Sequence, residues 1–564
     1  MFKGISASPG VAIGKALVYK ADALNIVKSS IQNTKDELER LQSSIEASRF
    51  QLEEIKAETG KNLGLDEAAI FEAHIMILED PEFTLQIINK IIEEKVCATY
   101  AANETIEAYA SIFDAMEDEY MKERAADIRD VGTRLLKNLL GIEIINLSNL
   151  SEEFILVAHD LTPSDTATMN TEKVLGFITE IGGSTSHTVI MARTLELPAI
   201  VGIKSIVKEI NNGDMIVFDG EEGIGYINPD NKTLEAYHSK KKEYELRRKE
   251  LIILKNQATI SKDNRRVELA CNIGTPKDVK AVLENGGEGI GLYRTEFLYM
   301  NRNSMPSEDE QYEAYKEVLE KMEGMPVIIR TLDIGGDKEL SYLNLPKEMN
   351  PFLGYRAIRI CLDQPEIFKI QLKALLRASV YGNLKIMYPM ISSVEEVRAA
   401  NDILNEVKRE LDGEFIQYSK EIEVGIMIEI PAAAVIGDLL IKEVDFFSIG
   451  TNDLIQYSTA VDRTNDKVSY LYEPFHPAIL RLIKMIIDFA HNDGKWVGMC
   501  GEMAGDPKMI PILLGLGLDE FSMSASSILP ARSLIGELSY YDMKKIAEKV
   551  LMLPTAGDVK NYLK

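Results

Sequence analysis

The sequence predicts a multidomain α/β protein: an α/β domain with an inserted all-helical subdomain, then a connecting helix, then a C-terminal (β/α)8 barrel. Three patterns in the 564 residues lead to this expectation. Strand-like runs at the N-terminus return only after a long stretch of helical periodicity, a strongly charged segment follows, and strand and helix patterns then alternate regularly. A chain of this length also exceeds the usual size of one hydrophobic core.

A helical insertion follows the N-terminal strands. Residues 1–20 alternate like one or two strands around "SPG", and from Thr34 the pattern becomes helical. Thr34 and Glu37 have the spacing of a capping box, which marks a helix start, and apolar residues then recur every three or four positions. We therefore expect residues 21–144 to form a helical subdomain inserted into a domain made by residues 1–20 and 145–228.

The α/β domain resumes in the runs "FILVAHDL", "VLGFITEI", "AIVG" and "MIVFDGEEGIGYINP". The charged residues 229–258 indicate a long, exposed connecting helix. Residues 259–564 then alternate strand and helix patterns, and the strand candidates are 266–273, 289–293, 326–333, 384–391, 423–430, 444–450, 495–501 and 518–523. Eight such units fit a (β/α)8 barrel. A doubly wound open sheet is the alternative, because a sequence pattern does not reveal whether a sheet closes.

Composition limits the classes of partner. The formal net charge of −26 disfavours nucleic acid and would attract a basic protein, unless it serves solubility alone. No apolar run reaches the roughly 18 residues that a membrane span needs. The four cysteines (Cys97, Cys271, Cys361 and Cys500) form no CxxC pair, which argues against a disulfide framework or a zinc site. We expect a cytoplasmic protein without nucleic-acid or membrane partners.

One histidine occupies an unusual position. The motif "GGSTSH" ends the strand-like run 174–181 and places His187 in the first turn of an expected helix over 187–195. Unpaired N–H groups and the helix dipole favour an anion at that point. A neutral or phosphorylated imidazole fits it better than a cationic one, which points to a nucleophile that gains negative charge. The alternative is a buried histidine bonded to a neighbouring hydroxyl, and the local pattern does not decide.

Polar residues follow several of the expected barrel strands, where the active site of such a barrel lies. They are Arg294 after the second strand, Arg330 at the end of the third, Glu429 at the end of the fifth, Asn452 and Asp453 at the end of the sixth with Arg463 in the loop beyond, and Cys500 at the end of the seventh. Arginine forks bind phosphate and carboxylate, and two carboxylates can hold Mg2+. A thiol could protonate an enolate carbon. Together these residue types suit a small, highly charged phosphoester.

Longer motifs show a family resemblance along essentially the whole chain. They are "ISASPGVAIGKA", "FEAHIMILEDPE", "ADIRDVGTRLL", "DLTPSDTA", "GGSTSHTVIMARTLELPAIVG", "GIGLYRTEFLYM", "RTLDIGGDK", "NPFLGYRAIR", "GIMIEIPAAA", "FFSIGTNDLIQYSTAVDR" and "GMCGEMAGD". In sequence and order, these motifs resemble the Enzyme I family of the bacterial phosphoenolpyruvate:sugar phosphotransferase system.

The resemblance implies an enzyme that transfers the phosphoryl group of phosphoenolpyruvate (PEP) to Nε2 of His187 and then to the phosphocarrier protein HPr, the first step of sugar uptake. The α/β part would be the phosphohistidine domain, the helical insertion would dock HPr, and the barrel would bind PEP and form a homodimer. The implied site residues are Arg294, Arg330, Arg356, Asn452, Asp453 and Arg463 for PEP, Glu429 and Asp453 for Mg2+, and Cys500 as the proton donor to the enolate.

Two positions depart from the family pattern. Ser184 stands where the family usually has arginine, and we interpret this as tuning of the phosphate environment. His159 stands where the family usually has a small residue and is either a bystander or a hydrogen-bond neighbour of the site. Pyruvate phosphate dikinase and PEP synthase would need a nucleotide-grasping domain, for which residues 33–140 are too short and too helical. A non-catalytic scaffold would not need Glu429, Asp453 and Cys500 together.

Overall fold

The computed structural model divides into two compact units, Met1–Arg247 and Arg248–Lys564. It describes residues 1–19, 26–62, 65–114, 119–142, 152–161, 173–182, 189, 192, 197–300, 302, 304–335, 340, 342–343, 345, 348–463, 465 and 467–563. Within them, no helix combines the length and the apolar character that crossing a membrane requires.

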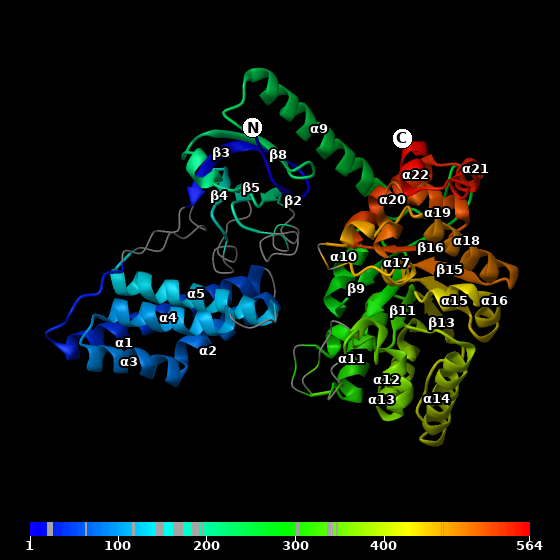
Figure 1. Ribbon diagram of the computed structural model, residues 1–564, viewed down its shortest axis with the longest axis horizontal. Coiled ribbons are helices and arrows are strands. Elements are labelled where there is room, and N and C mark those ends of the chain that lie inside the picture. Colours follow the sequence, from blue (N-terminus) through cyan, green and yellow to red (C-terminus); the bar gives the residue numbers. More distant parts are fainter. Residues whose placement is uncertain are drawn as a thin grey trace. The chain divides into compact units, whose positions relative to one another are not determined.

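The first unit contains a bundle of long helices (Figure 1), which are α1 (Thr34–Asn62), α2 (Leu65–Glu79), α3 (Pro81–Glu94), α4 (Ala98–Asp114) and α5 (Glu119–Leu140). The apolar residues that recur along each helix are buried between the helices, as Leu52, Ile87 and Leu135 illustrate. The first helix begins at Thr34, as expected. The carboxylate of Glu37, however, accepts a hydrogen bond from the N–H of Ala98 at 2.7 Å, at the start of α4. Helix packing thus uses this acidic side chain to cap a neighbouring helix.

The same unit contains a mixed sheet. Among the described residues the strand order is β1 (Phe2–Lys3), β8 (Ile224–Ile227), β7 (Met215–Asp219), β3 (Val11–Tyr19), β4 (Phe154–Ala158), β5 (Val174–Thr179), β6 (Ala199–Val201) and β2 (Ile5–Ser8). The N-terminal strand β3 pairs in parallel with β4, although the helical bundle separates them in sequence. The short helix α8 (Ile206–Glu209) follows β6. The expected α/β domain with a helical insertion is therefore confirmed.

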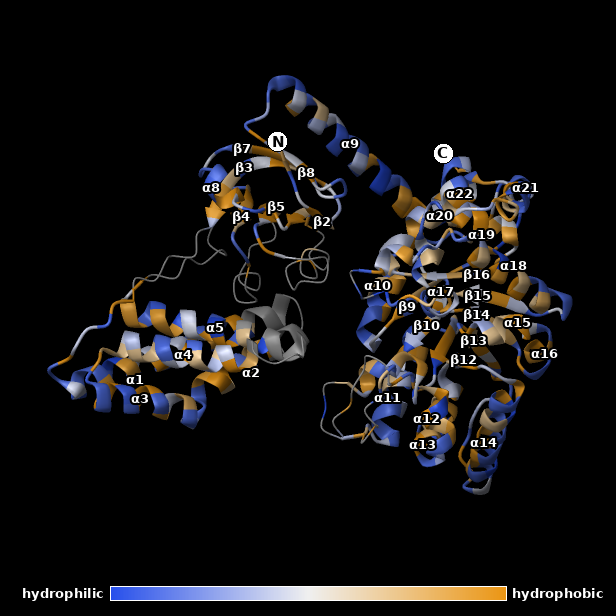
Figure 2. Ribbon diagram, in the orientation of Figure 1, coloured by the Kyte–Doolittle hydropathy of each residue, from blue (hydrophilic) through white to orange (hydrophobic). Residues whose placement is uncertain are grey.

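The connecting helix α9 (Asn231–Ile253) carries mostly hydrophilic residues (Figure 2). Within the first unit, the ammonium of Lys240 on α9 forms ion pairs with Asp219 at 2.6 Å and Glu222 at 2.8 Å. Within the second unit, the buried guanidinium of Arg532 donates to the carbonyls of Leu254 and Lys255, at 3.1 and 2.9 Å, just after the helix. Each end of the connector is thus tied to its own unit by buried or half-buried charges.

The second unit is a closed barrel of parallel strands. They are β9 (Glu268–Ile273), β10 (Gly289–Arg294), β11 (Pro326–Arg330), β12 (Asn383–Tyr388), β13 (Glu423–Ile428), β14 (Phe446–Ile449), β15 (Trp496–Met499) and β16 (Glu520–Met523). Strand β16 pairs with β9, which closes the barrel and excludes the open-sheet alternative. Every expected strand is present. Most end a few residues earlier than expected because the chain turns there into the loops that lead to the helices.

Helices surround these strands (Figure 1). They are α10 (Val279–Glu284), α11 (Glu308–Lys321), α12 (Ile358–Asp363), α13 (Pro365–Ala378), α14 (Val394–Gly413), α15 (Pro431–Val435), α16 (Gly437–Leu440), α17 (Thr451–Thr459), α18 (Pro477–Asn492), α19 (Ile510–Leu516), α20 (Ile528–Glu537), α21 (Tyr540–Val550) and α22 (Ala556–Tyr562). Their apolar faces pack on the outside of the strands in one continuous core.

Candidate active site

The carboxyl ends of the barrel strands border a cleft of about 770 Å³. Every barrel residue selected from the sequence lines this cleft: Arg294, Arg330, Arg356, Glu429, Asn452, Asp453, Arg463 and Cys500. Arg294 and Arg330 end their strands, and Glu429 and Cys500 directly follow theirs. Strand direction therefore brings together side chains that lie far apart in the sequence.

Two of the arginines are buried and held by carboxylates. Arg330 donates to Glu296 at 2.7 Å and forms an ion pair with Asp333 at 2.9 Å. Arg356 donates to the other oxygen of Asp333, also at 2.9 Å. Burial lowers the pKa of Arg330, but Asp333 and Glu296 outweigh burial and leave this pKa raised. Both guanidinium groups are thus kept charged and in fixed orientations.

The other two arginines are more exposed. Arg294 lies with its guanidinium 5.1 Å from the ring centre of Phe297 and forms no ion pair within the described part of the chain. Arg463 has 41% of its side chain exposed and reaches Glu502 only at 4.0 Å. Their positive charge is largely uncompensated, which suits the binding of a multiply charged anion.

Glu429 and Asp453 lie in the same cleft. Burial, and next the negative charges of Asp453 and Asp333, raise the pKa of Glu429 to about 8 against the opposing effect of Arg330 and Arg356. Burial also raises the pKa of Asp453, against the opposing effect of Arg356. One oxygen of Glu429 accepts from the N–H of Met390 at 2.6 Å.

This donor set fits a divalent cation. Its hard oxygen ligands repel one another when ionised, and a cation would relieve the repulsion. No three His, Cys, Asp or Glu side chains form a complete cage among the residues that the structure describes. The carboxylates therefore fit a metal whose shell is completed by ligand oxygens and water.

Cys500 is buried at the end of β15, and burial raises the pKa of its thiol to about 12. The thiol is therefore protonated at neutral pH. Asn272 donates to the carbonyl of Cys500 at 3.0 Å, and the hydroxyl of Ser522 donates to Asn272 at 2.6 Å. These bonds fix the backbone that carries the thiol.

Sequence reasoning missed Asn272, Glu296, Asp333 and Glu502, which also line the cleft. Glu502 accepts from the side-chain amide of Asn452 at 3.3 Å. Glu296, Asp333 and Glu502 lie inside the motifs "GLYRTEF", "RTLDIGGDK" and "GMCGEMAGD", so their position at strand ends was a visible signal. A motif does not reveal which of its polar side chains turns inward.

The remaining site prediction, His187 with Ser184, lies outside the described residues. Val189 and Ala192, from the segment after His187, belong to the same buried cluster as Phe177 of β5. His159 follows β4, and its Nδ1 lies 2.6 Å from the carboxylate of Glu180, which follows β5. The hydrogen bond with His159 lowers the pKa of Glu180. His159 therefore has a structural partner of its own.

Comparisons with known proteins agree with this geometry. Three models of PEP-utilising enzymes match the chain: the PEP-binding domain over residues 248–540, the N-terminal domain over 3–124 and the mobile domain over 150–223. The fold and the cleft thus define an enzyme of the PEP-utilising class.

Similar proteins identify the family within this class. The chain is 56% identical to a phosphoenolpyruvate-protein phosphotransferase of Priestia megaterium over 100% of this chain and 98% of that one. Its counterpart in Bacillus subtilis (strain 168) is also 56% identical, over 100% and 99% of the two chains. A solution structure of an Enzyme I protein matches 43% of this chain and 100% of that one, with 48% identity and a TM-score of 0.40. The chain belongs to the family of phosphoenolpyruvate-protein phosphotransferases.

Proposed function

We propose that the protein transfers the phosphoryl group of PEP to its own His187 and then to the phosphocarrier protein HPr, as the first step of a sugar phosphotransferase system. The observation that supports this most is the single cleft that gathers four arginines, two repelling carboxylates and a buried thiol. Few substrates other than a small phosphorylated carboxylic acid need all of these groups together.

In this proposal the arginines share the binding of PEP. Arg330 and Arg356, fixed by Asp333, form a rigid wall that orients the substrate. The positive charges of Arg294 and Arg463 are largely uncompensated, and these two side chains bind the phosphate and the carboxylate of PEP. Asn452, held between Glu502 and the hydroxyl of Tyr472, contributes a fixed amide at the rim.

Glu429 and Asp453 would hold Mg2+. The bound ion would neutralise negative charge on the phosphoryl group and on the enolate that leaves. Both carboxylates lie beside arginines that orient them, so the residues are arranged for the metal before the substrate arrives.

His187 would attack the phosphorus through Nε2, so that a nitrogen–phosphorus bond forms as the bond to the enol oxygen breaks. The electron pair of that bond leaves with the enolate, whose methylene carbon takes the proton of the Cys500 thiol to give pyruvate. The thiolate then regains a proton from solvent. A thiol with a pKa of about 12 is fully protonated before this step, as an acid must be.

The other parts of the chain have complementary roles in the proposal. Residues 1–20 and 145–228 carry the phosphohistidine, residues 229–258 connect it to the barrel of residues 259–564, and residues 21–144 dock HPr. Exposed apolar side chains on the helical bundle, such as Met76 and Leu85, support a docking surface there. Exposed Val435 and Leu439 on the barrel support a homodimer face, and the four free cysteines support a reducing cytoplasm.

The deciding experiment is incubation of the full chain with radiolabelled PEP, Mg2+ and HPr. We expect an acid-labile, base-stable label that appears on the wild type, passes to HPr and is absent from His187→Ala. His159→Ala is the matched control and should label normally, because His159 is bonded to Glu180. Label on the His187→Ala variant would contradict the assignment.

A further inference from the structure

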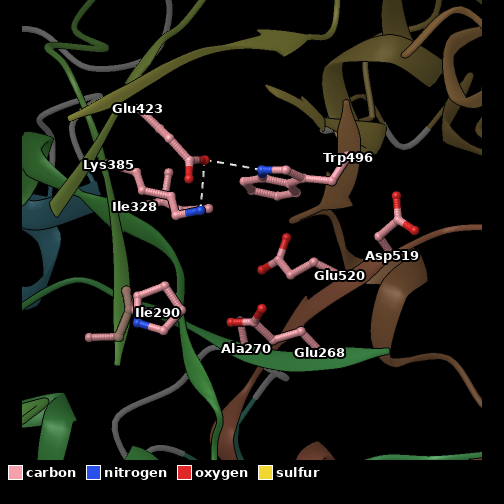
Figure 3. Close-up of a pocket in the computed structure, with 10 residues that line it drawn as sticks. Glu268, Ala270, Ile290, Ile328, Lys385, Glu423, Trp496, Asp519 and Glu520 are labelled. Carbon is pink, nitrogen blue, oxygen red and sulfur yellow. Dashed lines mark hydrogen bonds and ion pairs between the residues drawn. The ribbon is translucent and has the colours of Figure 1, made fainter. Parts of the chain in front are cut away.

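A second cavity, of about 240 Å³, is drawn in Figure 3 and lies at the opposite end of the barrel from the first. Glu268, Glu423, Trp496 and Glu520, the first residues of β9, β13, β15 and β16, line it. The PEP cleft lies where strands end, and this cavity lies where they begin. The two cavities share no lining residue.

The charges in this cavity do not balance. Lys385 is the one cation among the described residues that line it, and it donates to Glu423 at 2.7 Å. The indole N–H of Trp496 donates to the same oxygen at 3.1 Å, so that the carboxylate of Glu423 already has two hydrogen-bond donors (Figure 3). Glu268 and Glu520 are register partners on adjacent parallel strands, and their side chains therefore project on the same side. Two carboxylates thus lie side by side, and neither forms an ion pair within the part of the chain that the structure describes.

Glu520 is the clearest sign of a missing partner. It is 4% exposed, and neither of its oxygens has a hydrogen-bond donor among the described residues. Figure 3 shows its carboxylate projecting into the cavity. A Cβ added at Gly291 or Gly498 would overlap these oxygens, so glycines leave the space that the carboxylate occupies. Burial, and next the charge of Glu268, raise the pKa of Glu520 well above its usual value.

The walls indicate what kind of cation would fit. Besides the carboxylates, they are formed by Ala270, Ile290, Pro326 and Ile328 and by Trp496. No three metal-ligating side chains form a cage in the part of the chain that the structure describes. The faces of the indole are already covered, since Phe446 stacks at 4.5 Å and the ammonium of Lys385 lies 4.5 Å from a ring centre. The indole therefore has no free face with which to form an aromatic cage around a cation. The groups that remain for a ligand are two carboxylates beside an apolar wall.

We propose that this end of the barrel binds a small primary amine as its ammonium ion. The ammonium lies between the carboxylates of Glu268 and Glu520, and a short alkyl chain packs against Ile290 and Ile328. A primary ammonium supplies three donors, which is enough for both carboxylates. The size of the cavity limits the ligand to a short chain.

Trp496 makes the proposal directly testable, because it is the only tryptophan of the chain. We would titrate the full-length protein with n-butylamine in an amine-free buffer and follow tryptophan fluorescence. A saturable change is expected with butylammonium and none with n-butanol. Glu520→Gln and Glu268→Gln should each weaken the binding at least about tenfold, because each removes one partner of a desolvated charge pair. Glu421→Gln, an exposed change of the same kind just before β13, should bind like the wild type.

A second readout separates binding from misfolding. Butylammonium should raise the midpoint of thermal unfolding of the wild type and of Glu421→Gln, but not of Glu520→Gln, whose own unfolding must remain cooperative. Equal responses to butanol and butylamine, or undiminished binding by Glu520→Gln, would overturn the proposal. A response to Mg2+ or K+ with none to the amine would also overturn it, in favour of an inorganic ion.

Discussion

Buried carboxylates at the two ends of the barrel differ in whether they have charged or hydrogen-bonding partners. At the carboxyl ends of the strands, Asp333 is held by both Arg330 and Arg356. At the amino ends, Glu520 is just as deeply buried but has no donor among the described residues. One scaffold therefore contains a buried carboxylate that arginines compensate and another that no described side chain compensates.

The difference follows from where the cations can come from. The loops after the strands are long enough to carry arginines back over the barrel mouth, as the loop with Arg356 does. Arginines fixed in this way bind an incoming anion without reorganisation. At the other mouth Lys385, the one cation among the described residues that line the cavity, donates to Glu423. The first end is built to receive an anion, and the second end can be balanced only by a proton or an external cation.

The largest expected effect on activity and stability comes from removing a buried arginine from the cleft at the carboxyl ends of the strands. Arg330→Met should lower kcat/KM for PEP by roughly 10³-fold or more. It should also lower the free energy of unfolding by about 3–5 kcal/mol, because Glu296 and Asp333 lose their shared cation. Steady-state kinetics and urea unfolding measure the two effects.

Arg398→Met is the control for this change. Arg398 pairs with Glu443 at 2.6 Å on an exposed face, so its loss should cost less than about 1 kcal/mol and leave turnover unchanged. If the two variants behave alike, the arginine network does not organise the site.

The second prediction concerns the thiol at the same end. Cys500→Ala should retain PEP binding but lower turnover by about 10²–10⁴-fold, because only protonation of the leaving enolate is removed. Calorimetric titration with PEP and pyruvate release measure the two quantities separately. Cys271→Ala is a matched control: burial raises the pKa of Cys271 to about 12 as well, but this residue does not line the cleft. Normal turnover of Cys500→Ala would remove the thiol from the mechanism.

The smallest expected effect is a change in stability at the amino ends of the strands, where Glu520 lies. Above the ordinary pKa of glutamate, about 4.3, the unfolded chain releases a proton that folded Glu520 retains. The unfolded state then binds fewer protons, so this group makes the fold less stable as pH rises. Glu520→Gln should therefore be more stable than the wild type at pH 8, by about 1–2 kcal/mol, with the advantage shrinking toward pH 5.

Urea unfolding in amine-free buffer at several pH values measures this dependence. Glu421→Gln should show no comparable trend, because Glu421 is exposed. A Glu520→Gln variant whose advantage is independent of pH would mean that Glu520 is not held protonated in the fold.

The sequence was informative wherever a pattern is local. The regular alternation of strand-like and helical patterns located every barrel strand, and polar residues after those strands identified seven residues of the cleft. The eighth, Arg356, came from the family resemblance. The partners of these residues were not predictable. Arg330 is held by Glu296 from the preceding strand–helix unit, and Asn272 of β9 reaches past β16 to the backbone of Cys500, which follows β15. Such contacts depend on loop paths that no periodicity encodes. The role of His187 remains a prediction.

The sequence by itself determined the order of the domains, the alternation of strand and helix, and the chemical types gathered at the strand ends. These are properties of short windows of the chain, where side-chain periodicity and turn residues act directly. Only the tertiary structure decided that the sheet closes, because closure depends on pairing between the first and last strands, β9 and β16. That pairing also brings Glu268 beside Glu520 and so forms the second cavity. No local pattern in the sequence predicts this cavity.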